Sequence, residues 1–194
     1  DAPMVWLDGL DIPVLQFLDA SFVEQWPDDS QPVTRPEGDN LARYGQGLLP
    51  VDHDQRGHTS PVFNYPYTRT REALATLGRT EDWDACHGAK LRYVNPETGD
   101  HVMNTIAAFM QLLPKGFSGE TYRSTDATVF CAVEGAGETS IGDQTFKWDP
   151  RDTFVAPSWA PISHKSLDGE AVLFSFSDRS MQQKLGLWRE KRGS

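Results

Sequence analysis

Short runs in which apolar and polar residues alternate dominate the second half of the chain. From residue 91 onward these runs are separated by Gly, Pro, Asn and Asp, and a period of two is typical of strands that bury one face. We expect strands at 91–94, 105–113, 128–133, 139–141, 145–148, 153–156 and 171–176. Turn signals that recur about every 8–12 residues predict an antiparallel sandwich or barrel.

The first half of the chain is less regular. Residues 1–7 form an apolar run that predicts a strand, and residues 10–22 fit a buried strand or a short helix. Residues 27–60 are polar with scattered Pro and Gly, which indicates a long connector. The segment 61–67 reads as extended and aromatic.

Two helices are expected. The first begins with Thr70 as its N-cap, buries Ala73, Leu74 and Leu77, and ends at Gly78. The second begins near Asp178 or Ser180 and runs to about Leu185, and residues 189–192 are expected to form a solvated tail.

Composition limits the function classes. The 194 residues carry a formal net charge of −10 and form no dense basic cluster, which argues against a nucleic-acid partner. No apolar run approaches the ~18 residues of a membrane span, and no signal peptide is visible, so we expect a cytoplasmic protein without a membrane partner. Cys86 and Cys131 are too few for a disulfide scaffold, and Cys131 is expected to be a buried free thiol.

The first residues indicate that this sequence is a piece of a longer polypeptide. It opens with Asp1-Ala2-Pro3 rather than Met and passes at once into an apolar run. We therefore expect it to begin within or just after an earlier domain.

Two segments resemble the motifs of the cupins, which are jelly-roll β-barrels. GFSGETYRSTDATVFCAVEGAG (116–137) is similar to the first cupin motif, and WDPRDTFVAPSWAPISH (148–164) is similar to the second. In a cupin, a His-x-His on one strand and a third His on a later strand hold iron and leave positions for substrate and O₂. The resemblance implies an all-β cupin with a long N-terminal connector and a few short helices.

Nearly the whole chain resembles the gentisate 1,2-dioxygenase family, which includes salicylate and 1-hydroxy-2-naphthoate dioxygenases and carries two cupins in tandem. APMVWLDGLDIP looks like the end of the N-terminal cupin, and LGLWRE looks like the C-terminal tail. The resemblance implies four parts: the end of the N-terminal cupin at 1–26, a connector at 27–60, a C-terminal metal-free cupin at 61–178, and a C-terminal helix and tail at 179–194.

The resemblance also implies where the metal lies. The family binds Fe(II) in its N-terminal cupin through a His-Arg-His, whereas the corresponding positions here are Tyr122, Arg123 and Ser124, and a third ligand would fall near Ile162. We expect no metal in this chain and Fe(II) in the N-terminal half of the parent enzyme. That enzyme would convert gentisate and O₂ to maleylpyruvate during aromatic compound catabolism, and this chain alone would be inactive.

The resemblance assigns a pocket wall to the first residues. Asp8 would lie beside the substrate and orient it or the iron's surroundings, and Leu10 and Ile12 would limit the substituents of the ring. The alternative for Asp8 is a turn-forming residue before Gly9. Expected partners are the N-terminal cupin half of the same polypeptide, further copies in a homotetramer, and an aromatic hydroxy acid.

Other polar residues have simpler interpretations. His164 is expected to bond a neighbour at the barrel mouth rather than a metal, and His87 and His101 are expected to be structural or surface residues. Arg123 and Asp126 are expected to make structural ion pairs or turn contacts. The remaining sets were also weighed: Asp52, His53, Asp54 and His58 as a metal cluster or a solvated loop, and Phe63, Tyr65, Tyr67, Trp148 and Trp159 as a ligand cage or core.

Two rival functions remain open. The chain is a non-catalytic cupin that binds a small ligand or serves as a scaffold, or it is an isolated metal cupin with ligands drawn from His53, His58, His101 and His164. Metal analysis separates them, because only the last binds iron by itself.

Overall fold

The fold was obtained as a computed structural model, which describes residues 3–55, 57, 59–80 and 82–193. The helices are α1 (Ile12–Phe17), α2 (Asp39–Tyr44), α3 (Tyr67–Gly78) and α4 (Arg179–Lys184). The strands are β1 (Ala89–Arg92), β2 (Ala107–Leu113), β3 (Tyr122–Ser124), β4 (Thr128–Glu134), β5 (Gly137–Ile141), β6 (Gln144–Trp148), β7 (Thr153–Ala156), β8 (Ile162–Ser166), β9 (Ala171–Ser177) and β10 (Glu190–Arg192).

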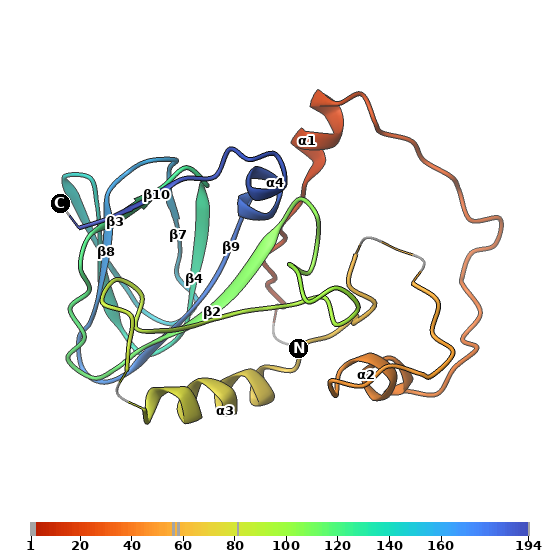
Figure 1. The fold of residues 1–194 in the computed structure, drawn as a ribbon, viewed down its shortest axis with the longest axis horizontal. Helices are drawn as coiled ribbons and strands as arrows, with labels where there is room; N and C mark the ends of the chain where they lie inside the picture. Colours follow the sequence, from red (N-terminus) through yellow and green to blue (C-terminus); the bar gives the residue numbers. More distant parts are fainter. Residues whose placement is uncertain (1–2, 56, 58, 81, 194) are drawn as a thin grey trace.

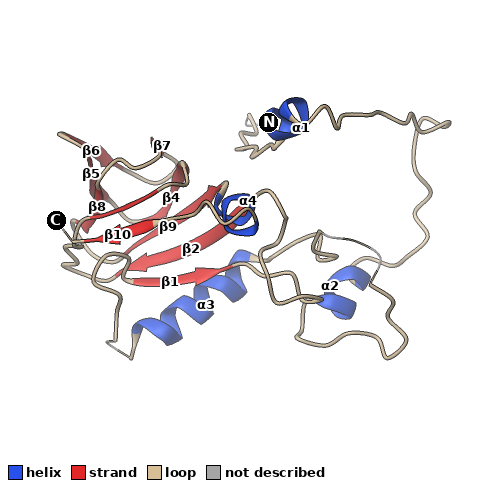
Figure 2. Cartoon of the chain, turned by 45° about the horizontal axis from the view of Figure 1, so that its top comes forward, coloured by secondary structure: helices blue, strands red, loops and turns tan. Residues whose placement is uncertain are grey.

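The strands form two antiparallel sheets, in the orders β1-β2-β9-β4-β7 and β10-β3-β8-β5-β6. Figures 1 and 2 show the sheets facing each other, with α3 along the outer side of the first sheet. This architecture confirms the predicted all-β cupin with a few short helices.

The alternation in the sequence separates two hydrophobic clusters. On β2, Leu113 points into the barrel and packs with Phe130 and Leu173, whereas Met110 and Leu112 point outward beneath Leu74 of α3. The central strands β2 and β9 therefore bury both faces, as in sheets covered by a helix.

Gly137 makes the close approach of β5 and β6 possible. It lies opposite Trp148 in the ladder, and a Cβ atom there would collide with the Trp148 ring and lie 2.6 Å from the carbonyl oxygen of Lys165. Trp148 can therefore lie flat over the strand and donate its indole N–H to the hydroxyl of Thr139 at 2.9 Å.

Four local predictions are wrong. Residues 3–7 form no strand, because no neighbouring strand is available to pair with their backbone. Thr70 lies inside α3, whose N-cap is Pro66, and its hydroxyl accepts a hydrogen bond from Tyr93. Of the predicted buried stripe only Leu74 is fully buried, since Ala73 and Leu77 face solvent.

The fourth error concerns the C-terminal tail, which was expected to be solvated. Residues 190–192 form β10 and pair with β3, so the tail closes the edge of the second sheet. β8 was also not predicted, although it pairs with β5 along its whole length.

Much of the segment before α2 lies apart from the barrel. Figures 1 and 2 show residues 18–38 as a long loop that stands away from both sheets before α2. Two contacts tie the first residues to the barrel: the Thr105 hydroxyl donates to Asp11 at 2.7 Å, and Gly9 packs against the Phe176 ring. In the described residues, no helix has the length and apolar character needed to cross a membrane.

Candidate functional site

The two cupin motifs meet inside the barrel. Tyr122 on β3 and Ile162 on β8 are cross-strand partners, and their side chains are 4% and 3% exposed. The positions that carry metal ligands in a cupin therefore do converge, but they present a phenol and an alkyl group.

His164 lies fully buried beside these residues. Its Nδ1 is 2.9 Å from the Thr139 hydroxyl, its Nε2 is 3.5 Å from the Tyr122 hydroxyl, and the Phe130 ring packs edge-on against it. Burial lowers the pKa of His164 well below its usual value, so the imidazole is neutral at pH 7. The predicted hydrogen bond to a neighbour is confirmed, but the residue lies in the core rather than at the mouth.

A second imidazole lies on the other side of Tyr122. The ring centroids of His87 and Tyr122 are 4.3 Å apart, and burial lowers the pKa of His87 to about 4. His87 is therefore a buried structural residue, which is one of the two roles expected for it. The sequence around His87 does not predict this place in the barrel. The residue lies in a turn before β1, where its backbone N–H donates to the Asp84 carboxylate.

The donors in this barrel do not fit Fe(II). An iron site of this kind needs several imidazole or carboxylate ligands on one face, and no three His, Cys, Asp or Glu side chains of the described residues converge in that way. Burial also raises the pKa of Tyr122, so its hydroxyl stays protonated and offers no phenolate.

The other histidines are held elsewhere. His53 contacts the Glu97 carboxylate and the Tyr44 ring, and His101 Nε2 lies 2.9 Å from the Gln183 side-chain oxygen. His58, the fourth residue of the rival metal set, lies outside the described residues. Asp52 and Asp54, which were weighed with His53 as a metal cluster or a solvated loop, are exposed in a loop.

Asp126 forms the expected structural ion pair, but with Arg179 rather than Arg123. Its carboxylate accepts hydrogen bonds from Arg179 Nε at 3.1 Å and from the Trp188 indole at 2.8 Å. Burial opposes ionisation, yet the Arg179 charge and several hydrogen bonds hold the pKa of Asp126 at about 2. The Nε atom of Arg123 is buried and has no partner among the described residues.

The residues assigned to a pocket wall all face solvent. Asp8 and Leu10 lie in the extended segment before α1, and Ile12 is the first residue of that helix. The structure brings none of them to the cupin motifs. The five aromatic residues weighed as a cage are likewise spread from the core (Trp148) to the surface (Phe63).

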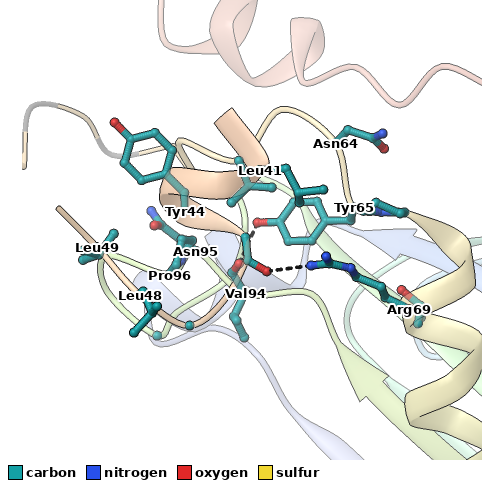
Figure 3. A pocket seen from close by; sticks show the side chains of 16 residues that line it. Leu41, Tyr44, Leu48, Leu49, Asn64, Tyr65, Arg69, Val94, Asn95 and Pro96 are labelled. Atoms are coloured by element: carbon teal, nitrogen blue, oxygen red, sulfur yellow. Dashed lines mark hydrogen bonds between the residues drawn. The ribbon is translucent and has the colours of Figure 1, made fainter. Parts of the chain in front are cut away.

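A pocket of about 560 Å³ lies outside the barrel, where α2 and the following loop approach the turn after β1. Figure 3 shows Leu41, Leu48, Tyr65 and Val94 around it, with Arg69 hydrogen-bonded to a backbone carbonyl at its edge. Its lining is mostly apolar and offers no acid–base pair for chemistry.

The chain is similar to ring-cleaving dioxygenases along nearly its whole length, although no family model matches it. It is 56% identical to gentisate 1,2-dioxygenase 1 of Aquipseudomonas alcaligenes over 99% of the chain and 55% of that protein. It is 34% identical to 5-aminosalicylate 1,2-dioxygenase of a Comamonas species over 97% of the chain and 50% of that protein.

A solved dioxygenase structure is also similar to this chain. The salicylate 1,2-dioxygenase of Pseudaminobacter salicylatoxidans superposes with a TM-score of 0.82 at 32% identity, over 94% of this chain and 53% of that one. The chain therefore spans about half the length of the relatives that it matches.

Proposed function

The chain belongs to the gentisate 1,2-dioxygenase family, and we propose that it is the C-terminal half of an Fe(II)-dependent enzyme that cleaves the ring of an aromatic hydroxy acid such as gentisate. In this proposal the iron belongs to the N-terminal cupin. The barrel described above is the metal-free partner, and the isolated chain is inactive.

Two observations together carry this proposal. The relatives are dioxygenases of about twice the length, and the barrel lacks the donors for iron at the positions where a cupin holds them. A chain that shares 56% of its residues with such an enzyme, yet offers no iron cradle in the part that the structure describes, fits the half that does not carry the chemistry.

The exposed apolar side chains of the first residues also support the assignment of the chemistry to an N-terminal cupin. Their large apolar side chains lie in water, including Val5, Trp6, Phe17, Phe22 and Val23. A contiguous set of exposed apolar residues marks a surface that another part of a protein covers. We assign that role to the N-terminal cupin, so that residues 1–26 complete its wall and Asp8, Leu10 and Ile12 face its substrate.

The remaining tasks of this chain are structural. The barrel is rigid because both of its sheets are packed, and it can hold the N-terminal segment in place through Gly9 and Asp11. A homotetramer of the whole enzyme is part of the proposal.

A test compares this chain with a polypeptide extended by the N-terminal cupin. We expect the extended protein to bind one iron per chain and to cleave gentisate, which is followed by the absorbance of the ring-opened product. The chain alone is expected to do neither. In the extended protein, Asp8→Asn should impair turnover, whereas Asp28→Asn, in the exposed loop, should not.

Stoichiometric iron bound by the chain alone, or ring cleavage by it, would contradict the proposal. An extended protein that binds iron but cleaves no hydroxybenzoate would contradict the assignment of the reaction.

A further inference from the structure

The end of the barrel beside β1 and β10 opens into a cavity of about 420 Å³, here called the barrel mouth. Lys90, Phe109, Arg179, Trp188 and Glu190 are among the residues that line it. We infer that the barrel mouth binds a small organic carboxylate through the ammonium group of Lys90.

The first reason is the charge balance of the mouth. Asp84 and Glu190 both pair with Arg192, and Asp126 behind them pairs with Arg179. Of the cations that line the mouth in the described residues, Lys90 alone has no hydrogen bond or ion pair, since Arg92 donates to the Gly99 carbonyl. Lys90 is thus the cation of the cavity whose ammonium group remains available to an anion, although the carboxylates of Asp82, Asp84 and Glu190 also line the cavity.

The second reason is the position of that cation. Lys90 lies opposite Gln111 in the β1–β2 ladder, so its side chain points toward the barrel interior, and its Nζ lies 4.9 Å from the centroid of the Phe109 ring. An inward lysine without a hydrogen bond or ion pair costs stability, because its charge leaves water and nearby carboxylates offset that loss only in part. A bound carboxylate would remove that cost.

The third reason lies behind Lys90. Gln111 is fully buried, and its side-chain oxygen has no partner among the described residues; the same is true of His87 Nδ1 and the Ser175 hydroxyl. Buried polar atoms in folded proteins are nearly always hydrogen-bonded. Of these three residues only His87 lines the cavity, so its Nδ1 can contact the polar end of a ligand that lies beside Lys90.

The remaining walls set the type of ligand. Phe109 and Trp188 present ring faces with the Arg179 guanidinium between them, at 5.1 and 4.8 Å from the ring centroids, and Leu77 and Leu91 add aliphatic surface. A cavity of this size with a few polar groups and apolar walls is typical of small-molecule sites. A carboxylate with a short hydrocarbon or ring body fits it. This site is independent of the iron and of ring cleavage.

The charge on Lys90 should respond to pH. Burial and the nearby Arg179 lower the pKa of Lys90 to about 7, and Asp126, Glu190 and Asp84 oppose that shift. His87 on the same side is neutral at pH 7 because burial lowers its pKa. Carboxylate binding should therefore be strongest below pH 7 and weaken as Lys90 loses its proton.

The test is isothermal titration of this chain with sodium benzoate at pH 6. We expect saturable one-to-one binding that weakens at least about 10-fold in Lys90→Met, the loss expected for a charge-assisted hydrogen bond. Lys147→Met is the matched control, because Lys147 is an exposed residue on β6 far from the mouth in sequence and sheet order, and it should bind like the wild type. Lys90→Gln repeats the test if the methionine variant does not fold.

Three results would overturn the inference: no benzoate binding by the folded chain, equal binding by both Lys90 variants, or equal binding of the neutral analogue benzamide. Displacement of benzoate by equimolar sulfate or chloride would also overturn it, since it would show an unspecific anion site.

Discussion

At the scale of single residues, the best defined feature is the buried ion pair of Asp126 and Arg179. The carboxylate is 3% exposed, and Arg179 lies between two aromatic rings. Removing one partner of such a pair leaves the other charge buried without compensation, which is more costly than the pair itself is favourable.

We therefore expect Asp126→Ala to lower the free energy of unfolding at pH 7 by about 3–5 kcal/mol. Because the folded pKa of Asp126 is depressed to about 2, this contribution is present above pH 4 and is lost as the pH falls toward 2. Urea unfolding at pH 7 and pH 3 measures both effects. The control Asp143→Ala, in an exposed turn, should change stability by less than about 0.5 kcal/mol; equal losses in the two variants would refute the assignment.

Residue identity also carried the central functional prediction. Tyr122, Ser124 and Ile162 could be read as non-ligands from the sequence, because side-chain chemistry does not depend on the fold. The neighbours of His164 could not be identified from the sequence, since Thr139 and Tyr122 contact it from other strands.

At the scale of elements, strands with a clear period of two were predicted nearly to the residue, as β7 (Thr153–Ala156) and β9 (Ala171–Ser177) show. Short strands were missed when their alternation spans too few residues to be recognised, as in β3 and β10. These two strands pair with each other, and the paired residues lie 66 to 70 positions apart in the chain.

The β5–β6 hairpin depends on one glycine. We expect Gly137→Ala to lower the free energy of unfolding by roughly 1–3 kcal/mol, because the added methyl group must displace Trp148 or the Lys165 backbone. Thermal unfolding followed by tryptophan fluorescence measures the change. Gly142→Ala serves as a comparison with open space around it, where only backbone strain at its positive φ acts; an unchanged midpoint in Gly137→Ala would show that the close packing is not needed.

At the scale of the whole molecule, the barrel is well packed, whereas the segment before α2 is exposed along most of its length. The segment before α2 buries little of its own apolar surface, and Figure 2 shows it separated from the sheets along most of its length. Its few contacts with the barrel predict that it contributes little to the stability of the fold.

Deletion of residues 1–26 should therefore leave the thermal midpoint of the barrel within a few degrees of its original value. The fluorescence of a dye that binds exposed apolar surface should fall, because 12 of the 26 exposed large hydrophobic residues in the described part of the chain are removed. A loss of cooperative unfolding would instead show that these residues are an integral part of the barrel.

The sequence by itself determined the barrel class, the family resemblance and the chemical types of the residues at the former ligand positions, because alternation and side-chain identity are local properties. Only the tertiary structure decided that residues 3–7 are not a strand, that the tail becomes β10, and that Lys90, His87 and Gln111 share the barrel interior. The reason is that strand pairing and the inward direction of a side chain depend on partners distant in the chain, which no local pattern specifies.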